Sequence, residues 1–108
     1  MNASVHHLNA CTETWMHCES LLLTLSHNGV AYSSRTVSVI DECANVCLGT
    51  MEALRSGGLH LGSLALLCVG LCEECAEVCG RYVDDRFQAC ASICRNCSAL
   101  LAPLAQVA

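Results

Sequence analysis

The cysteines constrain this chain more than any other feature. Eleven of its 108 residues are cysteine, and nine of those repeat at intervals of three or four residues. Because an α-helix has about 3.6 residues per turn, this spacing places the cysteines of each segment on one helix face. Small disulfide-rich folds instead scatter an even number of cysteines through loops rich in Gly and Pro. We therefore expect free thiols arranged in stripes along helices.

Breaker residues divide the chain into four helical segments. His27-Asn28-Gly29, Gly57-Gly58 and Pro103 mark the ends of three of them, and Asp84 or Asp85 caps the last. The second segment begins near Ser38, or a turn earlier near Ser34. The predicted helices cover about 5–26, 38–57, 59–83 and 84–103. The segments between these helices are short, and short connections make neighbouring helices run antiparallel. The sequence therefore predicts one all-α domain over 1–108, an antiparallel up-down-up-down four-helix bundle.

The charged residues indicate where the cysteine stripes point. Glu73, Glu74 and Glu77 avoid the stripe of the third segment, and Arg95 avoids that of the fourth. A single buried cysteine is an ordinary, inert packing residue. Eleven on inward stripes fill less volume than Leu or Ile would, which predicts a weakly packed core unless something else occupies it. We expect a cysteine-lined core that holds soft metal ions.

Composition excludes several classes of protein. The net charge is −5 with only five Lys and Arg, which is unsuited to binding a nucleic acid backbone. The longest nearly uncharged apolar run, Leu59–Leu71, is too short to span a membrane. The first residues show no basic start followed by an apolar stretch, so we expect no secretory signal and a cytoplasmic location. No phosphate loop, dinucleotide motif or nucleophile–base pair is recognisable, and we expect no enzyme.

Zinc and copper are the competing cargoes. Cys72-x2-Cys75 and Cys94-x2-Cys97, separated by 18 residues, fit a four-cysteine zinc pattern. Four thiolates around Zn²⁺ leave a net charge of −2 in a dry core, whereas one Cu(I) per thiolate is neutral. Soft thiolates also select Cu(I). Several Cu(I) ions per chain are therefore the main prediction, while a zinc protein and a thiol-redox protein remain alternatives.

These motifs also resemble a known family. The run Asp41-Glu42-Cys43-Ala44-x-x-Cys47, then Gly57-Gly58-Leu59-His60, and then the two cysteine-rich stripes are similar to the bacterial copper storage proteins, over about residues 38–100. The resemblance implies a cytosolic store or buffer of Cu(I), assembled as a homo-oligomer, commonly a tetramer. It implies metal ligation by every cysteine: Cys11, Cys18, Cys43, Cys47, Cys68, Cys72, Cys75, Cys79, Cys90, Cys94 and Cys97.

One end of the predicted bundle gathers other soft or nitrogen ligands. In an antiparallel bundle His6, His7, Met51 and His60 meet there. By resemblance to the family, His60 and Met51 are candidate entry ligands for copper, although terminal histidines are usually solvated and a Met usually fills space. Thr50 stands where a further cysteine step would be expected. Together with the two cysteines of the first segment, this predicts a reduced capacity.

Overall fold

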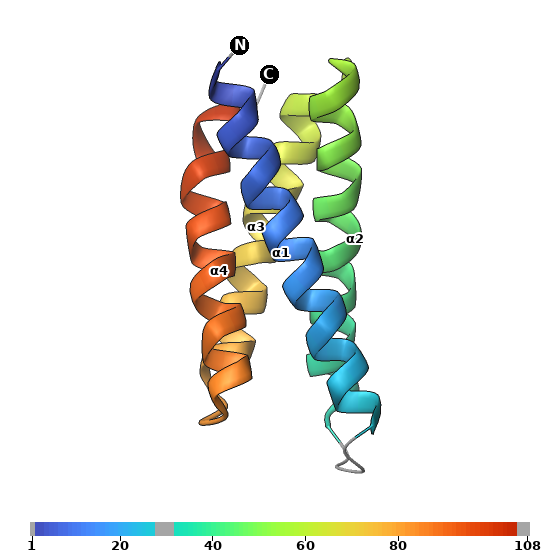
Figure 1. The fold of residues 1–108 in the computed structure, drawn as a ribbon, viewed down its shortest axis with the longest axis vertical. Coiled ribbons are helices and arrows are strands. Elements are labelled where there is room, and N and C mark those ends of the chain that lie inside the picture. Colours follow the sequence, from blue (N-terminus) through green and yellow to red (C-terminus); the bar gives the residue numbers. More distant parts are fainter. Residues whose placement is uncertain (1, 28–31, 106–108) are drawn as a thin grey trace.

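Four helices make up nearly all of the chain. The computed structural model describes residues 2–27 and 32–105, and within them no strand is present. The helices are α1 (Asn2–His27), α2 (Ser34–Ser56), α3 (Leu61–Gly80) and α4 (Asp85–Leu101), and a short 3₁₀ turn (Ala102–Leu104) follows. Figure 1 shows the four long helices running side by side along the long axis of the molecule.

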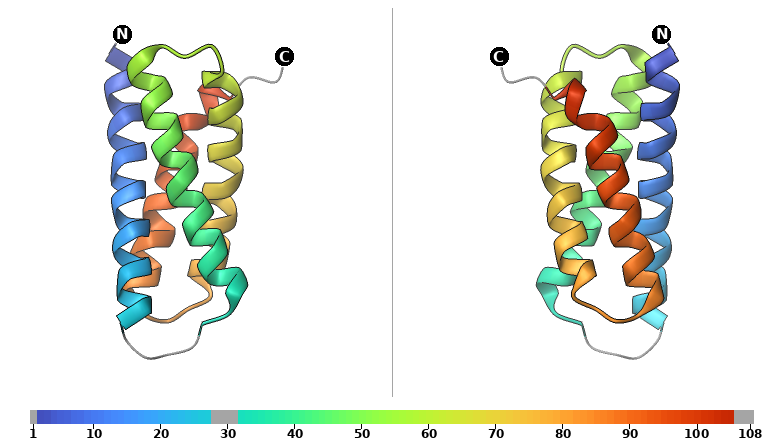
Figure 2. Two further views of the ribbon diagram at one scale, coloured as in Figure 1. Left: turned by 90° about the vertical axis from the view of Figure 1, so that its right-hand side faces the viewer. Right: turned by 90° about the vertical axis from the view of Figure 1, so that its left-hand side faces the viewer.

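The helices form an antiparallel square. Each packs against two neighbours, in the pairs α1–α2, α2–α3, α3–α4 and α1–α4, while in the described residues no Cα atom lies within 8 Å of a Cα atom of the diagonally opposite helix. The α2–α3 connection lies at the same end as the start of α1, and the α3–α4 connection lies at the opposite end (Figure 2). The molecule measures 43 × 21 × 19 Å. The predicted up-down-up-down bundle is confirmed.

The start of α2 differs from the position first predicted. The helix begins at Ser34, and the Ser33 side chain caps it by accepting a hydrogen bond from the Thr36 backbone N–H at 3.1 Å. The Thr36 hydroxyl in turn pairs with the Tyr82 hydroxyl at 2.9 Å. Of the two predicted starts, the earlier one near Ser34 is therefore confirmed and the one near Ser38 is wrong, because a contact with a distant residue supports the earlier turn.

The third helix is shorter than predicted at both ends. Gly57 adopts the left-handed conformation (φ 67°) that ends α2, and the chain then turns before α3 begins at Leu61. At the other end, α3 stops at Gly80 instead of continuing to residue 83. There the Gln88 side chain donates hydrogen bonds to the Gly80 and Tyr82 carbonyl oxygens. Asp84 caps α4 as predicted, accepting from the Arg86 backbone N–H at 2.8 Å.

Candidate metal centre

All eleven cysteine side chains lie in the core of the bundle. Each is at most 1% exposed, and none is in a disulfide. The predicted inward direction of the thiol stripes is therefore confirmed for every helix. The spacing of three and four residues explains the arrangement, because it matches the face that each helix turns toward its two neighbours.

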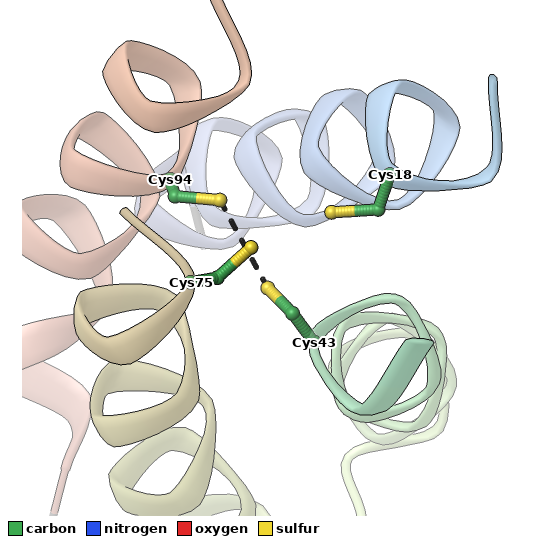
Figure 3. Close-up of side chains that lie close together, drawn as sticks. All are labelled: Cys18, Cys43, Cys75 and Cys94. Carbon is green, nitrogen blue, oxygen red and sulfur yellow. Dashed lines mark hydrogen bonds between the residues drawn. The ribbon is translucent and has the colours of Figure 1, made fainter. Parts of the chain in front are cut away.

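One cluster takes a thiol from each of the four helices. The Sγ atoms of Cys18, Cys43, Cys75 and Cys94 lie within 4.8 Å of one another, and all four side chains are buried. Figure 3 shows them converging on one point between the helices. Cys43 and Cys94, from opposite corners of the square, have their sulfur atoms 4.0 Å apart. We call this group the middle cluster.

A second cluster lies nearer the end where the chain begins. It contains Cys47, Cys68, Cys72 and Cys97, again with all sulfur atoms within 4.8 Å. The shortest separation, 3.7 Å, joins Cys47 and Cys68. We call this group the upper cluster. The four cysteines of the zinc-like spacing are divided between the clusters, since Cys75 and Cys94 belong to the middle one and Cys72 and Cys97 to the upper one.

The clusters join into one continuous ladder of sulfur. A third group, the lower cluster, contains Cys75, Cys79 and Cys90 and shares Cys75 with the middle cluster. Cys18 of the middle cluster lies 3.9 Å from Cys90 of the lower one. Cys43 of the middle cluster lies 3.8 Å from Cys72 of the upper one. A metal ion at any level therefore has sulfur ligands of the next level close by.

Neighbouring thiols shift one another's pKa in opposite directions. Hydrogen bonding with Cys43 and other thiols raises the pKa of Cys18, and the same contact with Cys18 lowers the pKa of Cys43. Likewise Cys11, beside Cys68 and Cys97, has a raised pKa, while hydrogen bonds led by that from Cys11 lower the pKa of Cys68 to about 5. Each donor stabilises the neighbouring thiolate. The pKa of each thiol in these pairs therefore depends on the hydrogen bonds with its sulfur neighbours.

Two threonines interrupt the sulfur lining. Thr14 and Thr50 are completely buried, and their hydroxyls donate to the backbone carbonyls of Ala10 and Val46 at 2.8 and 2.7 Å. Each hydroxyl is thus satisfied within its own helix. Thr50, where the sequence analysis expected a further cysteine, therefore does face the core.

The two ends of the ladder have different side chains. Beyond the lower cluster, Tyr32, Tyr82 and Phe87 pack together, with the Tyr82 and Phe87 rings stacked at a centroid distance of 4.2 Å. At the opposite end Met51 is buried, whereas His60 is exposed just before α3. His6 is also exposed and His7 is half-buried. Within the described residues, none of these histidines belongs to a group of three or more side chains placed to hold a metal ion.

Sequence reasoning missed some side chains that close the core. The stripe of α1 continues through Leu21 and Leu25, which are buried, whereas Leu22 is only half-buried. The aromatic group was not anticipated either. Phe87 lies three residues before Cys90, and this spacing could have predicted that Phe87 shares the inward face of the cysteine stripe.

The arrangement suits soft, monovalent ions. It offers many thiol ligands, excludes water and places no carboxylate or histidine among the sulfur atoms of the three clusters. Within the described residues, no helix has the length and apolar character needed to cross a membrane. Thiolates bound by several soft cations satisfy both the ligand preference and the charge balance of such a core.

Comparisons with known proteins agree with this geometry. A solved structure of a Cu(I)-bound copper storage protein, BsCsp3, superposes with a TM-score of 0.90, is 25% identical, and the match covers 96% of this chain and 99% of that one. The uncharacterized cysteine-rich protein YhjQ of Bacillus subtilis (strain 168) is 26% identical over 92 residues, which are 84% of this chain and 85% of that protein. The family model described as copper storage protein matches residues 1–105, and this chain therefore belongs to the copper storage protein family.

Proposed function

We propose that this protein stores or buffers several Cu(I) ions per chain on the thiolates of its core. The single observation that carries the proposal is the sulfur ladder, in which eleven unbridged thiols are buried along one axis. The copper bound to the structural relative supports it. The ligands we propose are all eleven cysteines.

Charge favours copper over zinc in this core. Filling the upper and middle clusters with one Zn²⁺ each would leave eight thiolates with four positive charges. The remaining negative charge would lie where no counterion is present, because the acidic and basic side chains are on the surface. One Cu(I) for each thiolate leaves no net charge, whatever the number of ions bound.

We further propose that copper enters at the end that carries Met51 and His60. The aromatic rings of Tyr32, Tyr82 and Phe87 pack together at the other end, which offers a copper ion no soft ligand. The Met51 thioether is a soft ligand at the edge of the core, and His60 is accessible to solvent. A storage role requires no catalytic group, and we propose a non-enzymatic protein of the cytoplasm that associates with copies of itself.

An anaerobic Cu(I) titration against a competing chelator tests the storage function. The reduced protein should bind several Cu(I) per chain and prefer Cu(I) to Zn²⁺ by several orders of magnitude. The double variants Cys75→Ser with Cys94→Ser, and Cys72→Ser with Cys97→Ser, should each lower the capacity while the helices persist. Ser92→Ala, on the exposed side of α4, is the control and should leave the capacity unchanged.

Two outcomes would contradict the proposal. Binding of one Zn²⁺ per chain without a copper preference would establish the zinc alternative. Reversible cycling of one dithiol pair with a disulfide substrate would establish the thiol-redox alternative.

A further inference from the structure

The lower cluster differs from the other two in the number of its thiols. The upper and middle clusters each contain four sulfur atoms, whereas the lower cluster contains three, those of Cys75, Cys79 and Cys90. Cys75 and Cys79 lie one helical turn apart on α3, with their sulfur atoms separated by 3.9 Å. Cys90 completes the triangle from α4, within 4.8 Å of both, and each side chain is at most 1% exposed. The fold thus holds a compact, buried triangle of free thiols.

The balance of charge restricts what this triangle can hold. Within the described residues, no histidine or carboxylate belongs to the group. The carboxylates beside it in the sequence are paired with arginines outside the core, Glu74 with Arg35 and Glu77 with Arg81. The guest must therefore balance the thiolates itself, because an uncompensated charge in a dry core is costly. A divalent ion leaves a net charge of −1 on three thiolates, whereas three Cu(I) ions or a single trivalent centre leave none.

The surroundings of the triangle suit a centre that needs no fourth ligand. Trivalent arsenic is soft; it binds three thiolates on one side and carries a lone pair on the other. Phe87, three residues before Cys90, is 1% exposed and stacks on Tyr82 with the ring centroids 4.2 Å apart. The Tyr82 hydroxyl is already paired with the Thr36 hydroxyl at 2.9 Å. The aromatic side chains next to the cluster are therefore apolar neighbours and not competing ligands.

We propose that Cys75, Cys79 and Cys90 bind one trivalent arsenic per chain, supplied as arsenous acid. Arsenous acid is uncharged at neutral pH, so it enters a dry core without the desolvation cost of an ion. Each thiol gives its proton to one hydroxyl group of As(OH)₃, three As–S bonds replace three As–O bonds, and three water molecules leave. Arsenic stays trivalent, so the step needs no oxidant or reductant. The proposal goes beyond copper storage, because it requires the thiols but no copper.

An anaerobic titration of the reduced, metal-free protein with sodium arsenite tests the site. Native mass spectrometry should detect one arsenic per chain, accompanied by the loss of three hydrogens. X-ray absorption at the arsenic edge should show three sulfur neighbours and no oxygen. An oxygen ligand retained on arsenic, or several arsenic atoms bound with equal affinity, would overturn the three-thiol site.

Serine substitutions test which thiols bind arsenic. Cys79→Ser should lower the affinity for arsenite by about a hundredfold or more, because two thiols lose the benefit of the linked third one. Cys11→Ser is the matched control, since Cys11 is 0% exposed but lies outside the three clusters, and its affinity should equal that of wild type. Cys79→Ala should lose as much affinity as Cys79→Ser, which shows that the missing sulfur and not the new hydroxyl is responsible. Circular dichroism confirms that each variant is helical.

Two results of these substitutions would overturn the assignment. One is unchanged arsenite affinity in the Cys79 variants. The other involves Cys18, whose sulfur atom lies 3.9 Å from that of Cys90. Loss of affinity in Cys18→Ser but not in Cys79→Ser would place arsenic in the middle cluster.

Competition with copper separates this proposal from copper storage. Protein filled with Cu(I) should bind no arsenite, because the same thiols are occupied, and arsenite uptake by the filled protein would overturn the proposal. Cys79→Ser should lose its arsenite site but keep most of its Cu(I) capacity, since ten thiols remain. A wild type that binds Cu(I) but no arsenite would overturn the arsenic site alone and leave the storage function standing.

Discussion

At the scale of single residues, the threonines of the core bear on how much metal the protein holds. Thr50 lies three residues after Cys47 on the same face of α2 and is fully buried, with its hydroxyl bound to a carbonyl of its own helix. A hydroxyl oxygen is a hard donor that Cu(I) does not prefer. Thr50 therefore lies where a metal ligand could lie, but its side chain offers no sulfur atom to bind Cu(I).

Replacing Thr50 should show this directly. We expect Thr50→Cys to raise the Cu(I) capacity by about one ion per chain, because the new thiol would join the ladder next to the upper cluster. Thr50→Val removes the hydroxyl without adding sulfur and should leave the capacity as it is. Anaerobic titration of the three proteins measures the difference. A Thr50→Cys variant with wild-type capacity would show that this level of the core is not open to copper.

Proton release should accompany copper binding at these residues. A thiol must lose its proton to ligate a metal, so copper binding should release protons. The hydrogen bonds that lower the pKa of Cys43 and Cys68 favour thiolates there even without metal, so we expect fewer protons to be released than Cu(I) ions are bound. Because protons compete with copper, the apparent affinity should fall as the pH falls, by about tenfold per unit for each proton displaced. A weakly buffered titration with a pH indicator measures the ratio, and copper binding without proton release would exclude thiol ligation.

At the scale of helices, tertiary contacts decide the boundaries. The Ser33 cap of α2 is reinforced by the bond between Thr36 and Tyr82, which connects the start of α2 to the loop after α3. No local pattern at Ser33 distinguishes it from the serines that follow. The end of α3 likewise depends on the Gln88 side chain eight residues beyond Gly80.

Alanine substitutions separate the cap that the structure shows from the one that spacing predicts. Ser33→Ala should lower the free energy of unfolding by about 1 kcal/mol, which corresponds to a fall in melting temperature of roughly 4–8 °C for a domain of this size. Ser38→Ala, on an exposed turn of α2, should change stability by less than about 0.5 kcal/mol. Thermal unfolding followed by circular dichroism checks both variants. The opposite ranking would mean that α2 begins at the later serine in solution.

The sequence predicts most of the fold because its signals are local and repeated. Spacing of three and four residues assigns the cysteines to helix faces, and the charged residues show which face is outside. What spacing does not determine is how thiols from different helices meet. The division of Cys72 and Cys75 between two clusters follows from the relative height of neighbouring helices, and that height depends on loops and caps. The aromatic group at one end depends on Tyr32, which is far in the sequence from Tyr82 and Phe87.

At the scale of the whole molecule, the core combines two kinds of packing. Ile40, Phe87 and Leu101 are large apolar side chains that are almost completely buried, and the thiols fill the space between such groups. The apolar groups favour the helical fold in the absence of metal. Cysteines alone contribute little packing per residue, so metal–sulfur bonds that connect all four helices should add much of the stability.

Copper loading should therefore stabilise a bundle that is already folded. We expect the metal-free, reduced protein to be helical and the Cu(I)-loaded protein to melt roughly 10 °C or more higher, because the folded core arranges ligands that the unfolded chain does not. Removing copper with an excess of chelator should return the melting temperature to its starting value without loss of helicity at 25 °C. Mg²⁺, a hard cation that prefers oxygen ligands, is the control and should cause no shift. Circular dichroism at matched concentrations makes the comparison. Collapse of the helices on removal of copper would show that the metal is a structural component and not a stored cargo.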